Sequence, residues 1–195
     1  NFKFLLLSFI LIGLSFYYLV NSINSILTKP ITKYDQLVIV EKNYNESDFL
    51  HYLNKKGVKI AIETEGSYRH PSHLLMQTPE EFKDLTKYYK CGELGINVNI
   101  GHLHLASKFF GFPKSELMDS VSSHIVAFEL SHNNGLDDQH LPLKNGGWYW
   151  DLIFDSRYKN AYKILEFRNQ SILEVKKALK LIERKSIEYL GNEVG

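Results

Sequence analysis

The sequence predicts an α/β fold built on a parallel sheet, and three observations support this prediction. Short apolar runs alternate along the chain with amphipathic segments of helical length. Most of the apolar runs end in an acidic or amide residue. The run at 124–128 leads directly into a polar stretch, 129–150, which is rich in histidine, aspartate and glycine. Buried strands that open into polar loops are the way an α/β barrel builds its active site.

Five segments are predicted as strands because each is a short run of mostly apolar residues. They lie at residues 37–40, 58–62, 96–100, 125–130 and 161–165. Since helical segments separate them, we expect parallel pairing through right-handed crossovers. The carboxyl ends of the strands then meet on one face of the sheet.

Four segments are predicted as helices, at residues 46–56, 79–90, 113–121 and 171–189. The first has Asn45 as a candidate N-cap and Gly57 as its stop. The second follows Thr78, a favourable N-cap, and starts with proline, which suits the first helical position. The last repeats apolar residues at helical spacing, beginning with Ile172.

The charge balance argues against a nucleic-acid-binding protein. Lysine and arginine total 23, and aspartate and glutamate total 22, which gives a net charge of +1. Tight binding to nucleic acid depends on clustered basic residues. Cys91 is the single cysteine, so no internal disulfide can form, and this fits a reducing compartment. We therefore expect a cytoplasmic protein.

The N-terminal segment 1–30 is unusual because its residues 4–20 carry no charge and are nearly all apolar. That length is at the lower limit for a membrane-spanning helix. A transmembrane or signal-anchor helix and a buried barrel helix both remain open, and the first would anchor the chain to a membrane. A signal peptide is less favoured, because no small-residue cleavage site follows Val20.

Side chains that can bind a metal or move a proton stand at four strand ends. They are Glu63, Asn99 with His102 close behind, Glu129, and Glu166. The polar loop adds Asp138 and His140. Several carboxylates on one face repel one another unless a divalent cation or a shared proton offsets their charge.

Three sequence pieces resemble the xylose isomerase-like TIM-barrel superfamily, which contains sugar and sugar-phosphate isomerases and epimerases and the endonuclease IV type of apurinic endonuclease. The pieces are VKIAIETEG at 58–66, GINVNIGHLHLAS at 95–107, and the loop 129–150 followed by ILEF at 164–167. The resemblance covers roughly residues 37–173. Two positions depart from the family pattern: Asn99 stands where the family has aspartate, and Glu129 where it has histidine.

The resemblance implies part of a TIM (β/α)8-type barrel. A complete barrel typically needs about 250 residues, and only five strands are predicted among the 195 residues of this chain. We therefore expect the C-terminal part of a barrel, about five strands, in a domain spanning 34–193.

The resemblance also implies a set of site residues. Glu63 and Glu166 are the expected acid/base pair, and the expected metal ligands are Glu63, Asn99, Glu129, Glu166, Asp138 and His140. The expected substrate contacts are His102, His132 and Arg168. Because the strand-end set keeps three carboxylates but loses its nitrogen ligand, a divalent cation such as Mg or Mn is favoured over Zn.

The activity implied first is that of an isomerase or epimerase of a sugar or sugar phosphate, with a proton transferred at the carbon next to a carbonyl. An endonuclease IV-type enzyme is the first alternative. A degenerate, non-catalytic barrel homologue is the second. The sequence specifies neither the substrate nor the oligomeric state.

Overall fold

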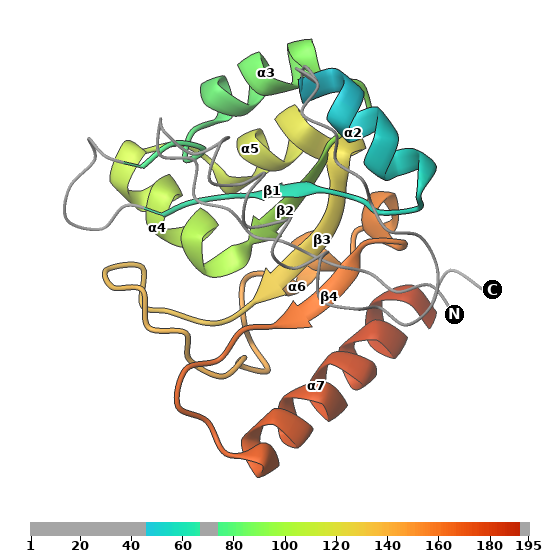
Figure 1. The fold of residues 1–195 in the computed structure, drawn as a ribbon. Coiled ribbons are helices and arrows are strands. Elements are labelled where there is room, and N and C mark those ends of the chain that lie inside the picture. The colour runs from blue at the N-terminus through green and yellow to red at the C-terminus, as the bar shows by residue number, and fades with distance from the viewer. Residues whose placement is uncertain (1–45, 67–73, 192–195) are drawn as a thin grey trace.

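The structure, a computed structural model, describes residues 46–66 and 74–191. Within these ranges four strands form one parallel sheet, in the same order as in the chain (Figure 1). They are β1 (Ala61–Glu63), β2 (Gly95–Asn99), β3 (Ile125–Leu130) and β4 (Tyr162–Leu165). The predicted parallel α/β fold is confirmed, and four of the five expected strands are present within it.

Two expectations fall on residues outside the described ranges. These are the strand at 37–40 and the apolar segment 1–30, and the expected domain 34–193 also extends past the described ranges at both ends. Among the helices that the structure describes, none combines the length and apolar character needed to cross a membrane.

Six helices accompany the sheet in the described part of the chain. They are α2 (Glu46–Lys55), α3 (Pro79–Tyr88), α4 (Ile100–Phe110), α5 (Lys114–Val121), α6 (Trp150–Ile153) and α7 (Ile172–Leu190). The four expected helices correspond to α2, α3, α5 and α7. The capping predicted for α3 is present, since the Thr78 side chain and Glu81 satisfy each other's backbone N–H groups.

The helix α4 was not expected from the sequence. It begins immediately after β2, because Asn99 is both the last strand residue and the N-cap of the helix. It ends at Gly111, whose φ of 77° is the left-handed conformation typical of a helix C-terminus. The predicted strand at 96–100 is therefore shifted by one residue from β2 at 95–99, and a helix follows β2 at once.

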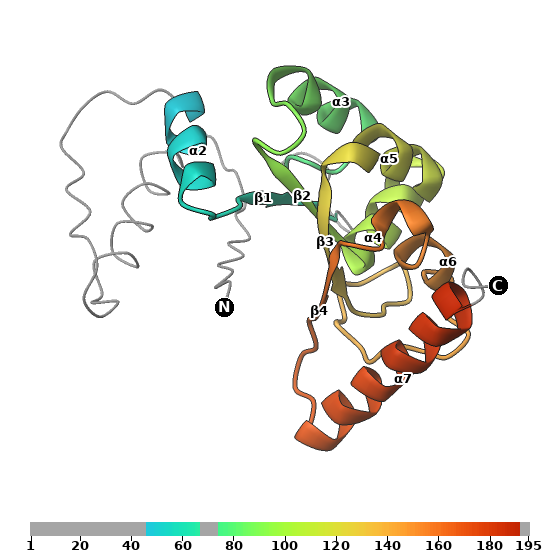
Figure 2. The same cartoon turned by 90° about the vertical axis from the view of Figure 1, so that its right-hand side faces the viewer.

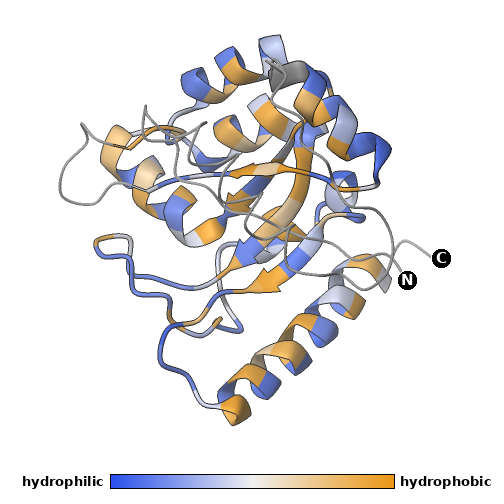
Figure 3. Cartoon of the chain, in the orientation of Figure 1, coloured by the Kyte–Doolittle hydropathy of each residue, from blue (hydrophilic) through white to orange (hydrophobic). Residues whose placement is uncertain are grey.

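The apolar core lies between the sheet and the helices α3 to α7, which Figure 2 shows on one side of the strands. Val98 and Phe128 are partners in the register of β2 and β3, and both are fully buried. They pack in one cluster with Phe82 of α3 and Leu117 of α5. In Figure 3 the hydrophobic colour dominates β3, whereas along α7 it alternates with the hydrophilic colour.

The second face of the sheet is polar. Successive strand side chains point to opposite faces, so the neighbours of Val98 in β2, Asn97 and Asn99, point away from the core. Asn99 lies opposite Glu129 in the register of β2 and β3. All three of these polar residues are buried. One face of the sheet therefore holds the fold together, and the other gathers polar side chains at the strand ends.

Candidate functional site

A cluster of three glutamates occupies the carboxyl ends of the strands. Glu63 ends β1, Glu129 is the fifth residue of β3, and Glu166 directly follows β4. One carboxylate oxygen from each of them lies within 4.8 Å of the others. We call these three residues the glutamate cluster. The four strand ends named from the sequence thus converge in the structure, because parallel strands present their ends on one side.

Asn99 stands at the centre of the glutamate cluster. Its Nδ2 donates to Glu63 Oε1 at 3.0 Å, to Glu166 Oε2 at 2.8 Å and to Glu129 Oε2 at 3.3 Å. Its Oδ1 accepts hydrogen bonds from the backbone N–H groups of Gly101 at 3.0 Å and His102 at 3.2 Å. The amide thus joins the cluster through its nitrogen and the start of α4 through its oxygen.

Glu129 is the carboxyl group most affected by this arrangement. Burial and the nearby Glu63 carboxylate raise the pKa of Glu129 to about 7. Asn97 opposes the shift by donating from Nδ2 to Glu129 Oε1 at 2.8 Å. Near neutral pH, a proton on Glu129 therefore offsets part of the negative charge of the glutamate cluster.

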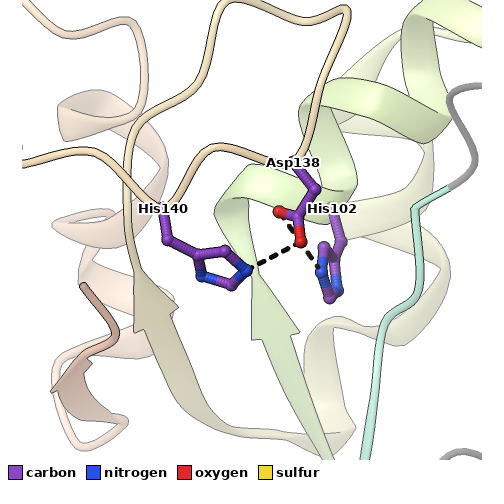
Figure 4. A group of neighbouring side chains, drawn as sticks. All are labelled: His102, Asp138 and His140. Carbon is purple, nitrogen blue, oxygen red and sulfur yellow. Dashed lines mark hydrogen bonds and ion pairs between the residues drawn. The ribbon is translucent and has the colours of Figure 1, made fainter. Parts of the chain in front are cut away.

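A second group, His102, Asp138 and His140, lies beside the cluster (Figure 4). His102 belongs to the first turn of α4, whereas Asp138 and His140 come from the loop between β3 and α6. His140 Nε2 is 2.7 Å from Asp138 Oδ2, and His102 Nε2 is 3.7 Å from Asp138 Oδ1. We call this the His–Asp–His group.

The two groups are joined at both ends. His102 Nδ1 is 3.3 Å from Glu63 Oε1, and His140 Nδ1 is 3.1 Å from Glu166 Oε2. His102 Nδ1 also lies 2.8 Å from the carbonyl oxygen of Thr64, which can only accept, so this nitrogen carries the hydrogen. Each of the two candidate acid/base residues thus contacts one imidazole of the His–Asp–His group.

The electrostatics of His102 follow from its neighbours. Burial alone would lower its pKa, but the Asp138 and Glu63 carboxylates outweigh burial and hold the pKa of His102 well above its ordinary value. Burial would likewise raise the pKa of Asp138, and the interaction with His102 instead lowers it. Asp138 is thus an ionised carboxylate that two imidazoles face.

The His–Asp–His group fits a divalent cation. Its three residues each place a ligand atom within 4.8 Å of the others. Asp138 Oδ1 is buried and has no hydrogen-bond partner in the structure. Two imidazoles and one carboxylate are a common donor set for divalent metals in catalytic sites.

The glutamate cluster fits a cation less well. Its three carboxylates are close enough to share an ion, but Asn99 directs two N–H bonds, not an oxygen, toward them. The expected role of Asn99 as a ligand therefore requires the amide to rotate and the start of α4 to lose its cap.

The remaining expected residues lie at different distances from the centre. Arg168 Nη2 is 3.8 Å from Asp138 Oδ2, and its side chain is largely exposed, so it borders the site. His132 lies farther along the loop, where its backbone pairs with Leu141 and its ring packs against Tyr149. No contact that the structure describes joins the His132 side chain to either group.

Sequence reasoning missed two residues that take part in the site. Asn97 holds Glu129, and Thr64 Oγ1 accepts a hydrogen bond from the backbone N–H of Asn99 at 3.0 Å. Asn97 could have been found, because it is two residues from Asn99 and shares its face of the strand. Thr64 carried no such signal, since it follows the end of β1.

The loop that carries Asp138 and His140 is tied to α4. The Asn133 side chain donates to the carbonyl oxygen of Gly101 at 2.8 Å. His132 and Leu141 exchange two backbone hydrogen bonds of 2.8 Å. Together these bonds fix the segment that brings Asp138 to the imidazole of His102.

A small cavity of about 130 Å³ lies at the opposite, amino end of the strands. Cys91, Ser123 and His124 are among the residues that line it. None of the expected site residues borders it.

The comparisons with known proteins show the fold. No family model matches the chain. Over 154 residues it is 25% identical to an uncharacterised protein of Methanocaldococcus jannaschii, a match covering 78% of this chain and 50% of that protein. The chain thus spans about half the length of the curated relative that it matches.

Solved structures with this fold include a D-tagatose 3-epimerase-like protein (TM-score 0.61, 18% identity, 99% of this chain and 65% of that one). Another is a candidate xylose isomerase from Rhodospirillum rubrum, with a TM-score of 0.52 and 14% identity. The match covers 75% of this chain and 51% of that one. A third is endonuclease IV from Thermus thermophilus, with a TM-score of 0.50 and 17% identity. The match covers 72% of this chain and 56% of that one. These similarities confirm the expected fold, which the chain shares with part of each of these longer structures.

Proposed function

We propose that this chain carries the reaction centre of a sugar or sugar-phosphate isomerase or epimerase. In this proposal Glu63 and Glu166 transfer a proton at the carbon next to a carbonyl. The observation that supports it is that each of these two carboxylates contacts one imidazole of the His–Asp–His group, Glu63 at 3.3 Å and Glu166 at 3.1 Å.

The residues of the site have distinct tasks in this reaction. One glutamate accepts the proton from carbon and the other returns a proton, which inverts a centre or moves the carbonyl. Asn99 donates to both carboxylates and keeps them oriented. His102 is held in place by its Nδ1 contacts with the Thr64 carbonyl oxygen and Glu63, and its Nε2 faces Asp138.

The cation proposed for this site is divalent and is held by His102, Asp138 and His140. When bound, it would polarise the substrate carbonyl as a Lewis acid. Arg168 at the edge of the site is placed to meet a phosphate group, for which a guanidinium is well suited. The proposed substrate class is therefore a ketose or aldose and its phosphate esters.

The test is the variant Glu166→Gln, which keeps the size of the side chain and removes its basicity. With a ketose that the wild type turns over in D2O, we expect incorporation of solvent deuterium at carbon to fall at least about 100-fold, the usual contribution of a general base. Glu183→Gln, on the exposed side of α7, is the matched control and should not change the rate. Equal deuterium incorporation in all three proteins would refute the role of Glu166.

A second candidate function is hydrolysis of a phosphodiester at abasic DNA. The His–Asp–His group fits a divalent cation and contacts the glutamate cluster through His140 and Glu166, and metal-assisted attack by water serves this chemistry. A nicking assay on an abasic duplex with Zn2+ or Mn2+ separates the two proposals. Metal-dependent nicking without sugar turnover would favour the nuclease.

A further inference from the structure

We propose that the Asn99 amide holds the glutamate cluster together in place of a divalent cation. The chain then keeps its cation at the His–Asp–His group alone, among the groups that the structure describes. The second part rests on the proposed function, whereas the first depends only on the geometry of Asn99.

The Asn99 amide nitrogen lies where a cation would have to bind. Nδ2 lies within 3.3 Å of one oxygen from each glutamate, so the nitrogen occupies the point toward which the three carboxylates converge. A cation bound by the same oxygens would have to occupy that point. The amide and the ion are therefore alternatives at one position.

Contacts at the start of α4 oppose a 180° rotation of the Asn99 amide, which would exchange its nitrogen and oxygen. Its oxygen accepts two backbone N–H groups at the start of α4, where helices favour an acceptor and a negative charge. A rotated amide would direct its N–H groups at these backbone donors and its oxygen at three carboxylates. Both changes replace hydrogen bonds with repulsion.

A second amide, that of Asn97, completes the hydrogen bonding of the glutamate cluster. Two N–H bonds of Asn99 cannot fully satisfy three carboxylates, and the longest of the three contacts is the one to Glu129. Asn97 supplies the further donor to that residue at 2.8 Å. Two neutral amides on one strand thus stabilise the glutamates without a metal.

The experiment compares bound Mn2+ in the full chain with asparagine, aspartate or serine at position 99. Aspartate and serine are both good N-caps, so both variants keep the start of α4. Asn99→Asp replaces the central donor with a ligand oxygen, and Asn99→Ser removes the donor without adding a carboxylate. Bound Mn2+ is counted by equilibrium dialysis and elemental analysis, and no activity is measured.

We expect Asn99→Asp to bind one more Mn2+ per chain than the wild type, and Asn99→Ser to bind no more than the wild type. Mn2+ should also raise the thermal midpoint of Asn99→Asp further than that of the wild type. An equal count in wild type and Asn99→Asp would overturn the inference, as would the same gain in Asn99→Ser.

The inference depends on the difference in Mn2+ count between Asn99→Asp and the wild type, whereas the proposed function depends on the wild-type count itself. A wild-type count of zero would remove the cation from the proposed function, yet the extra ion in Asn99→Asp would still support the role of Asn99. If the added charge prevents Asn99→Asp from folding, the double variant Asn99→Asp/Glu129→Gln restores the original charge. Its gain of one ion over Glu129→Gln supports the inference, and no gain contradicts it.

Discussion

Glu129 occupies a position where burial, a second carboxylate and two amide donors act on one carboxyl group. Its pKa in the folded protein, about 7, lies above the value near 4.5 expected in the unfolded chain. The folded state therefore binds more protons between these two pH values. Because proton binding is linked to folding, the titration of Glu129 lowers the free energy of unfolding as pH rises from about 4.5 to 7. Above pH 7 this loss is complete.

The variant Glu129→Gln should remove this dependence in metal-free protein. We expect it to raise the free energy of unfolding at pH 8 by on the order of 2–3 kcal/mol, with little change at pH 4.5. Urea unfolding at the two pH values in the presence of EDTA measures the effect. A pH dependence identical to that of the wild type would show that Glu129 titrates normally.

At the scale of elements, the site depends on how closely the end of β1 approaches the start of α4. A Cβ added at Gly66 would lie 2.7 Å from the Cα of His102 and 2.8 Å from its carbonyl oxygen. Both are backbone atoms, so neither can move away as the end of a side chain could. Glycine at this position is what allows Glu63 to reach His102.

Gly66→Ala should therefore separate the two elements. We expect a loss of roughly 1–3 kcal/mol in the free energy of unfolding, the usual cost of overpacking, together with weaker Mn2+ binding because His102 is displaced. Gly146→Ala is the control, since a Cβ there meets no atom within 4 Å. Denaturant unfolding and Mn2+ titration measure both effects, and wild-type values for Gly66→Ala would contradict the prediction.

Two described helices were left unpredicted by the sequence, and α4 is the longer of them. In 100–110 the apolar residues Leu103 and Leu105 are spaced by two, which also fits a strand, and a strong strand precedes them. The helix signals were present at its ends, in Asn99 and Gly111. The strand pattern outweighed these helix signals, because Asn99 is both the last residue of β2 and the N-cap of α4.

At the scale of the whole molecule, stability should be greatest in the middle of the sheet. Every residue of β2 is buried, and β2 and β3 each pair with a strand on both sides. In contrast, α7 leaves Ile172, Leu179 and Ile187 largely exposed. Segments with less buried apolar surface open at lower free energy.

Hydrogen exchange should reveal this gradient. We expect the amides of β2 and β3 to exchange through global unfolding, and those of α7 to exchange at least about tenfold faster, because α7 opens locally. Exchange measured by mass spectrometry under EX2 conditions tests this order. Protection of α7 equal to that of β2 would mean that the helix unfolds only with the sheet.

The sequence by itself determined the parallel α/β character, four described strands and the strand-end residues Glu63, Asn99, Glu129 and Glu166. It could do so because strand length, apolar periodicity and the position of a polar residue after a strand are local properties. The tertiary structure alone decided which atoms face one another. It placed Asp138 between His102 and His140, and turned the nitrogen of Asn99 toward the glutamates. These outcomes depend on the loop tied to α4 and on the helix start that holds the amide oxygen, which are contacts between segments distant in the chain.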